Sequence, residues 1–329
     1  MNSTHLYREQ RGAAILVALG VLIVLSLLGT SWVVYMSLES TDTRQDLYVA
    51  RAAAAAQGGA RAAIAQMQQA LRDRRAAELT ASPLVIDIPV YRADAKTAID
   101  AAPVLDDRYH AGVSAVITDE CAKVNVNFAP PNVLISLLGI DGDKARSIRA
   151  NLPRLDGSGA PGGGDPKNWL TSVDELIARN LLTADVLTTE RAAQLTVYTV
   201  PDPSNPEGFI NINSASEDVL RAVLDVTPDA AARVAAARPL SSAAELAAVA
   251  GKVASTFNYP PPPDDPGALP REFSFSSRCY RIVCSAGLDR IDLDNPQRRA
   301  SAGVETVVYF PEDGKPRILY WNEWARLGG

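Results

Sequence analysis

The feature that most constrains this chain is an uncharged apolar segment close to its N-terminus. No Asp, Glu, Lys or Arg occurs between Ala13 and Leu38, and the segment consists largely of Leu, Val, Ile and small residues. A helix of about 20 apolar residues is long enough to cross the hydrocarbon core of a bilayer. The segment is therefore predicted to be a membrane-spanning helix.

The charges on either side of this segment predict its orientation. Arg8 and Arg11 precede it, whereas Glu39 and Asp42 follow it. Because positive charges stay on the cytoplasmic side, the N-terminus is predicted to be cytoplasmic and the rest of the chain to lie across the membrane. A cleaved secretory signal has an apolar region of only about 7–15 residues. The length of the run therefore argues against its removal as a signal peptide.

The helical pattern continues beyond the apolar segment. Residues 41–78 contain no proline, are rich in Ala, Gln, Arg and Leu, and place apolar residues at helical spacing. Together with the apolar segment they predict one helix of about 60 residues, roughly 90 Å long at 1.5 Å per residue. Gly58 and Gly59 mark the point most open to a bend.

Two segments in the middle of the chain resemble each other. One begins at Lys123 and the other at Phe209, and both read as an N-x-N turn, a short helix, a tight turn and a second helix. Each is followed by a Ser or Thr and a Glu in capping-box-like spacing, from Thr171 and from Ser241. Each copy is predicted to be a helical hairpin.

Polar residues at the predicted helix ends support this interpretation. We expect side-chain caps, a glycine stop and an initial proline at these positions. In the first copy these are Asn127, Gly139 and Asp141 to Asp143; in the second they are Ser214 or Ser216, and Pro228.

Strand-like runs flank the repeated segments on both sides. They begin at Pro83 and Tyr109 before the repeats, and at Glu272, Ala302 and Pro316 after them. The predicted fold class is therefore α+β. A long N-terminal helix is packed with an antiparallel sheet, and an inserted all-helical domain of the helix-hairpin-helix or SAM-like kind interrupts the sheet.

Composition argues against several functions. The net charge of -6 does not suit a chain that coats nucleic acid, and the two histidines and three cysteines lack metal-ligand spacing. No nucleophile elbow, phosphate loop or zinc-protease motif occurs, so no catalytic residue and no cofactor are predicted. Asp289, Asp292 and Asp294 are a candidate calcium site, and a solvated acidic turn explains them as well.

The three cysteines leave the disulfide pairing open. Cys279 and Cys284 lie five residues apart in one predicted strand, about 16 Å apart and on opposite faces, so they cannot pair with each other. In an oxidising compartment Cys121 could pair with either of them. Burial of all three as thiols is the alternative.

The N-terminal pattern resembles that of type IV pilins and type II secretion pseudopilins. These proteins have a short basic leader, a glycine, and a helix that is apolar first and amphipathic later. The resemblance implies that a prepilin peptidase cuts between Gly12 and Ala13 and that Ala13 becomes N-methylated. In the family the fifth mature residue is usually Glu, which compensates the terminal charge of the subunit above, whereas this chain has Val17.

Within this family the chain resembles the large minor pseudopilins of the general secretion pathway protein K type. That resemblance implies a non-enzymatic, single-pass inner-membrane protein with a periplasmic bulk, which caps the pseudopilus tip and helps initiate its assembly for protein export. Its implied partners are I- and J-type minor pseudopilins, the major pseudopilin, the prepilin peptidase and the secreted substrates.

The resemblance also divides the chain into six parts. They are a leader (1–12), the N-terminal helix (13–80), the first part of the sheet (81–120), the helical insert (121–255), a proline-rich linker (256–271) and the second part of the sheet (272–329).

A membrane-anchored DNA receptor is the main alternative. The repeats are similar to helix-hairpin-helix modules, in which backbone N–H groups of the turn bind a phosphate. Here carboxylates occupy the first turn at Asp141 and Asp143, and the second turn, Asp225 to Asp229, contains no glycine. The turns therefore argue against nucleic acid as a partner. A periplasmic enzyme is the third alternative.

Overall fold

The computed structural model describes most of the chain. The described residues are 3–81, 84–87, 109–152, 169–199, 209–259, 261–262, 265, 267–290, 299–311 and 314–328. Inside helices and strands, side chains are described except at 3–16, 40–45, 47–48, 77, 81, 84–87, 109–112, 288–290, 299–300 and 327–328.

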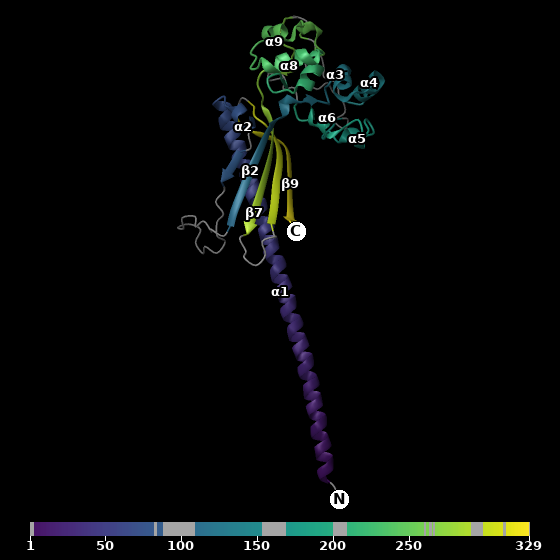
Figure 1. The fold of residues 1–329 in the computed structure, drawn as a ribbon, viewed down its shortest axis with the longest axis vertical. Coiled ribbons are helices and arrows are strands. Elements are labelled where there is room, and N and C mark those ends of the chain that lie inside the picture. Colours follow the sequence, from purple (N-terminus) through teal and green to yellow (C-terminus); the bar gives the residue numbers. More distant parts are fainter. Residues whose placement is uncertain are drawn as a thin grey trace.

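One helix, α1, dominates the molecule (Figure 1). It runs without interruption from Ser3 to Arg72, which is 70 residues or about 105 Å. The predicted helix is therefore confirmed, although it ends before Glu78: Arg74 adopts a positive φ of 58°, and a separate short helix, α2 (Ala76–Ala81), follows. Gly58 and Gly59 lie inside the continuous helix.

The second half of α1 packs against a five-stranded antiparallel sheet with strand order β1-β2-β7-β8-β9. Two strands come from before the helical insert and three from after it, so the insert interrupts the sheet as predicted (Figure 1). The strands are β1 (Leu84–Asp87), β2 (Tyr109–Asp119), β7 (Cys279–Arg290), β8 (Arg299–Tyr309) and β9 (Arg317–Gly328).

Small side chains allow α1 to approach the sheet closely. The buried face of the helix carries alanines spaced three or four residues apart, which is the spacing of one helical face. Opposite them lie apolar residues of β2, β7 and β8, including Ile117, Ile282 and Val304. This core is formed on the helix by Ala52, Ala55, Ala56, Ala60, Ala63 and Met67.

The helical insert, called the head below, lies at the end of the sheet away from the N-terminus (Figure 1). It contains two units, each closed by a short parallel strand pair, β3–β4 or β5–β6. The first unit comprises η1 (Glu120–Ala122), β3 (Val124–Asn125), α3 (Pro131–Leu138), α4 (Gly142–Ala150), α5 (Glu175–Ala178), α6 (Thr189–Ala193) and β4 (Leu195–Thr196). The second comprises β5 (Ile210–Asn211), α7 (Glu217–Leu224), α8 (Pro228–Ala236), α9 (Ala243–Ala250), η3 (Ala254–Thr256) and β6 (Phe273–Ser274).

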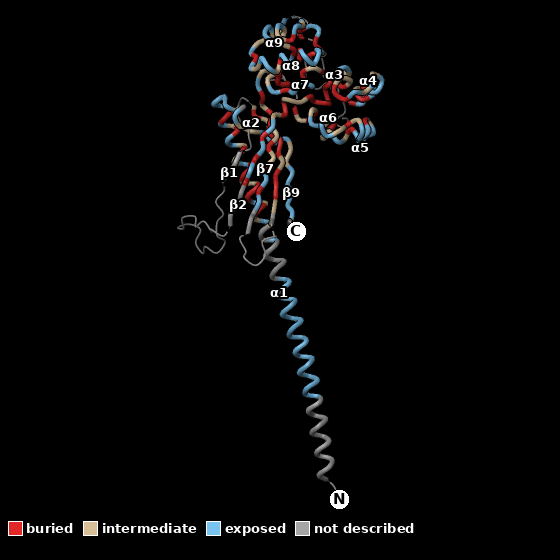
Figure 2. Tube along the Cα trace, viewed as in Figure 1, coloured by how far each residue is buried: buried red, intermediate tan, exposed pale blue. Residues whose placement is uncertain are grey.

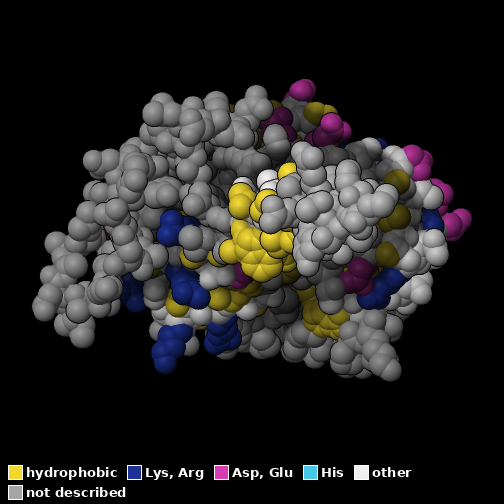
Figure 3. Space-filling model, turned by 90° about the horizontal axis from the view of Figure 1, so that it is seen from below, with side chains coloured by type: hydrophobic (Ala, Val, Ile, Leu, Met, Phe, Trp, Pro, Cys, Tyr) yellow, Lys and Arg dark blue, Asp and Glu magenta, His cyan; other side chains and the backbone are white. Residues whose placement is uncertain are grey.

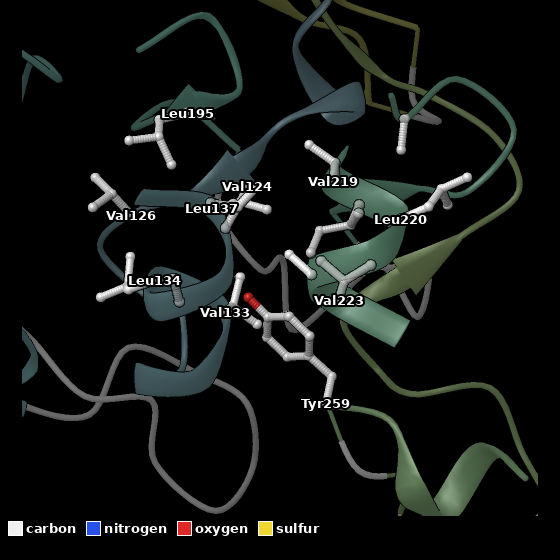
Figure 4. Packing of buried hydrophobic residues seen from close by; sticks show 14 of the residues in the cluster. Val124, Val126, Val133, Leu134, Leu137, Leu195, Val219, Leu220, Val223 and Tyr259 are labelled. Atoms are coloured by element: carbon white, nitrogen blue, oxygen red, sulfur yellow. The ribbon is translucent and has the colours of Figure 1, made fainter. Parts of the chain in front are cut away.

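The two units share one apolar core. Helices α3 and α7 face each other across it, with Val133 on α3 and Val223 on α7 beside the ring of Tyr259 (Figure 4). Together with the sheet on α1, this arrangement confirms the predicted α+β fold class.

The repeat predicted from the sequence is confirmed at the level of single hydrogen bonds. In the first unit the Asn127 side chain accepts from the N–H of Leu170 at 2.9 Å and donates to its carbonyl at 3.0 Å. In the second, Asn213 makes the same pair with Leu240, at 2.8 and 2.9 Å. The second Asn of each N-x-N motif thus holds the segment that opens the later helix.

This geometry corrects one predicted cap. Asn127 does not cap α3, whose N-cap residue is Pro130 without a side-chain bond. Asn127 is instead fully buried, and its amide donates a hydrogen bond to the carbonyl of Leu170. The predicted caps Asp141 and Ser216, the stop at Gly139 and the initial position of Pro228 are confirmed.

Replacing Asn127 with alanine is expected to lower the free energy of unfolding by about 2–3 kcal/mol, because a buried N–H and a buried carbonyl of Leu170 lose their partner. Asn132→Ala removes an exposed asparagine from α3 and serves as the control. Urea titration of the full-length protein in detergent measures both. Equal stability of the two variants would contradict this role of the N-x-N motif.

Candidate functional site

The first half of α1 is a large apolar surface that the chain itself leaves uncovered. Residues Val17–Glu39 form a helix long and apolar enough to cross a membrane, and none of this stretch is buried within the described structure. Figure 2 shows it as a continuous exposed segment beyond the sheet. Its composition and exposure suit a lipid bilayer or the equivalent helices of other subunits.

Figure 3 shows the molecule from the N-terminal end of α1, roughly along the helix axis. Seen from below, hydrophobic side chains gather in the middle of the face, and Lys and Arg side chains lie mainly to one side of them (Figure 3). Among the hydrophobic residues that the structure leaves exposed, those of α1 are Val17, Leu19, Val21, Leu22, Ile23, Val24, Leu25, Leu27, Leu28, Trp32, Val33, Val34, Tyr35, Met36 and Leu38.

Val17, the residue singled out in the sequence, lies at the outer end of this surface. The residue is 67% exposed, and no carboxylate occurs on the helix between it and Glu39. Gly12 and Ala13 belong to the helical backbone of α1, and only the backbone is described at these two positions. The predicted cleavage and methylation at these two positions stay predictions.

The candidate calcium site also lies outside the described residues. Asp292 and Asp294 are not described, and only the backbone of Asp289 is, at the end of β7. Among the residues that are described, no three His, Cys, Asp or Glu side chains are grouped to hold a metal ion.

A cluster of polar residues joins the sheet to the head. Its centre is Asp119 and Glu120, the last residue of β2 and the first of η1, which we call the junction carboxylates. From the sequence both residues were predicted only as the end of the first part of the sheet (81–120), and their role at the junction was not predicted. The signal in the sequence was a pair of adjacent acids that follows the apolar strand residues Val116 and Ile117 after a single threonine, Thr118.

Asp119 connects three segments of the chain. One carboxylate oxygen accepts from the Cys121 N–H at 2.8 Å, and the other accepts from the hydroxyls of Ser214 and Ser277 and, at 3.5 Å, from the Asn211 amide. Burial raises the pKa of Asp119 above its ordinary value, although these hydrogen bonds oppose the shift.

Glu120 is fully buried and has two cationic partners. Its Oε1 accepts from Lys123 Nζ and from Arg281 Nε, both at 2.6 Å, and its Oε2 accepts from the Thr196 hydroxyl at 2.5 Å. Burial alone would raise the pKa of Glu120, but the charges and hydrogen bonds of Lys123 and Arg281 outweigh it and hold the pKa below its ordinary value. Arg281 also pairs with Glu305 on β8.

The raised pKa of Asp119 makes the stability of the junction depend on pH. The stabilising contribution of Asp119 is present below its unfolded pKa of 3.8 and is lost as pH rises through its higher folded pKa. Asp119→Asn removes that loss, so its stability relative to the wild type is expected to increase as pH rises from about 4 to 7. Denaturant titrations across this range measure the difference. A stability difference that does not change with pH would contradict the raised pKa.

The hairpin turns use their own acceptors where a phosphate would bind. Asp141 accepts from the Lys144 N–H at 2.7 Å at the start of α4, and Thr227 accepts from the Ala230 N–H at 3.4 Å at the start of α8. In the second turn, Lys252 Nζ lies 2.7 Å from the carboxylate of Asp225. These contacts occupy N–H groups and a cation that a DNA-binding hairpin would use.

The fold and the site together define an α+β protein with an exposed apolar helix, a sheet on its second half and a helical head. No protein-family model and no curated protein sequence matches the chain. Among solved structures it is similar to a chain of the GspK–GspI–GspJ complex from the type 2 secretion system of enterotoxigenic Escherichia coli. That match has 12% sequence identity and a TM-score of 0.47, and covers 89% of this chain and 99% of the other.

Proposed function

We propose that this chain is a minor pseudopilin of the protein K type, which helps to initiate a type II secretion pseudopilus and caps its tip for protein export. The observation that carries the proposal is the apolar first half of α1, uncovered within the described structure and without a carboxylate at Val17. The sequence resemblance supplies the family. The division of the chain into leader, helix, two sheet parts, insert and linker belongs to the same proposal.

The lack of a carboxylate suits a terminal subunit. In the filaments that the resemblance implies, the glutamate of one subunit compensates the N-terminal charge of its neighbour above. A subunit with Val17 offers no such compensation and loses nothing where no subunit lies above it.

The place of the head supports the same position. The head lies beyond the end of the sheet that is farther from the N-terminus of α1 (Figure 1). It therefore widens the molecule at the level where the sheet of a subunit above would have to pack. In this proposal the head blocks further addition, and the exposed helix packs against the helices of the I- and J-type subunits below.

The proposal places the apolar helix in the inner membrane and the sheet and head in the periplasm, after cleavage by the prepilin peptidase and methylation of Ala13. The chain acts by assembly, without a catalytic residue or cofactor, and its surface contacts the major pseudopilin and secreted substrates.

Co-purification from membranes tests this assignment. A tagged chain is expected to retain I- and J-type pseudopilins in detergent. A variant in which Leu22, Leu25 and Leu28 on the exposed helix are changed to alanine is expected to retain less of them. The membrane-anchored DNA receptor remains the second candidate because both units do form helical hairpins. A gel shift of duplex DNA by the full-length protein, together with no retained pseudopilin, would favour it instead.

A further inference from the structure

Two of the three cysteines meet where the head is joined to the sheet. Cys121 lies in η1, directly after β2, and Cys279 is the first residue of β7. Both are buried thiols and belong to one small apolar cluster with Val307. Cys284 lies in the other core, beneath α1, on the opposite face of the sheet.

The strand register brings Cys121 and Cys279 together. Asp119 on β2 pairs with Tyr280 on β7 in an antiparallel ladder, so the residues after Asp119 run beside those before Tyr280. The Cys121 sulfur accepts hydrogen bonds from the backbone N–H groups of Arg278 and Cys279. One sulfur therefore lies against the backbone of the other cysteine, and both side chains belong to the same small cluster, so the two cysteines are neighbours across the junction.

We propose that Cys121 and Cys279 form a disulfide bond that fastens the two ends of the head to each other, while Cys284 stays a thiol. The inference rests on the proposed function, because a head across the inner membrane lies in an oxidising compartment. It selects one of the two pairings that the sequence left open.

The oxidant is a protein disulfide of the thiol–disulfide exchange class. The thiolate of one cysteine attacks that disulfide, forms a mixed disulfide and releases one oxidant thiolate. The second cysteine, as a thiolate, then attacks the mixed disulfide and releases the other. Two electrons pass to the oxidant, whose two sulfurs take up the two protons that the cysteines lose.

Burial sets the order of folding and oxidation. Desolvation is the main reason that the pKa of Cys121 rises to about 12, and it also raises the pKa of Cys279. The folded protein therefore holds very little of either thiolate, and exchange must take place before the junction closes. Once formed, the bond encloses the whole head in one covalent loop and restricts its unfolded state.

Trypsin separates the candidate cysteines cleanly. Cleavage after Arg108 and Lys123 releases Cys121 in peptide 109–123, cleavage after Arg278 and Arg281 releases Cys279 in peptide 279–281, and Cys284 falls in peptide 282–290. Cells are quenched with acid, and the full-length protein is denatured, alkylated without reductant so that buried thiols react too, purified, digested and analysed by mass spectrometry. The expected result is peptide 109–123 joined to 279–281, with alkylated Cys284.

Matched variants decide between the pairings. Cys284→Ser is expected to keep the joined peptide, whereas Cys121→Ser is expected to lose it and to leave Cys279 alkylated. Three alkylated cysteines in the wild type, or a bond from Cys121 to peptide 282–290, would overturn the proposal.

A second measurement on the same cells, protease access to the head in spheroplasts, distinguishes a failure of this inference from a failure of the proposed function. An accessible head with three alkylated cysteines refutes the disulfide alone. A protected head refutes the proposed compartment, and the disulfide with it.

Discussion

Replacing Glu120 with alanine is expected to lower the free energy of unfolding by about 3–5 kcal/mol, because the change removes one partner of a buried ion pair. Arg281 keeps Glu305, but Lys123 and the Thr196 hydroxyl lose the acceptor that holds β4 of the head to the end of the sheet. Urea titration of the full-length protein in detergent measures the loss. With Trp32, Trp321 and Trp324 replaced by phenylalanine in both proteins, the fluorescence of Trp169, which packs edge-on against Phe128, reports unfolding of the head.

Asp143→Ala is the matched control for Glu120→Ala. Asp143 also forms an ion pair with an arginine, Arg146, but both side chains are exposed to solvent. Exposed pairs contribute little, so no measurable change in stability is expected. If the two variants unfolded at the same urea concentration, the junction carboxylates would not be what joins the head to the sheet.

Replacing Gly12 with leucine is expected to abolish processing by a prepilin peptidase. The resemblance places the cut between Gly12 and Ala13, and a large side chain there is expected to prevent the peptidase from accepting the site. The measurement is N-terminal sequencing after co-expression with the peptidase. The wild type is expected to begin at methylated Ala13 and the variant at Met1.

Gly20→Leu makes the same change further along α1 and is the control. A Cβ at Gly20 meets no other atom within 4 Å, so the helix accepts the substitution and processing is expected to be normal. An intact Met1 in the wild type would contradict processing by the peptidase, and a processed Gly12→Leu protein would contradict the cut after Gly12.

The elements of this fold were predictable because local patterns determine them. The long helix follows from an uncharged run and a proline-free continuation, and the hairpins follow from two copies of one pattern that places caps and stops at fixed spacing. Neither prediction required knowledge of which elements pack against each other. The one wrong cap, at Asn127, arose because a polar residue before a helix can also bond to a distant segment, here Leu170.

The contacts between elements were not predictable in the same way. The roles of Asp119 and Glu120 depend on Ser214, Ser277, Thr196 and Arg281, which are far away in the sequence and meet only after the sheet and head have formed. The side chains at the edge of the sheet show the same limit. Strand pairing opposes Trp324 to Gly303, and a side chain at Gly303 would clash with its ring.

A subunit that ends a filament lies only at one end of it, so the position of this chain within assembled pseudopili shows whether it is the terminal subunit. An epitope tag after Gly329, with pseudopili imaged by immunogold electron microscopy, shows where the chain lies. Label is expected at one end of each filament and not along its length. Label distributed along the shaft, with further copies of the chain above one another, would contradict it.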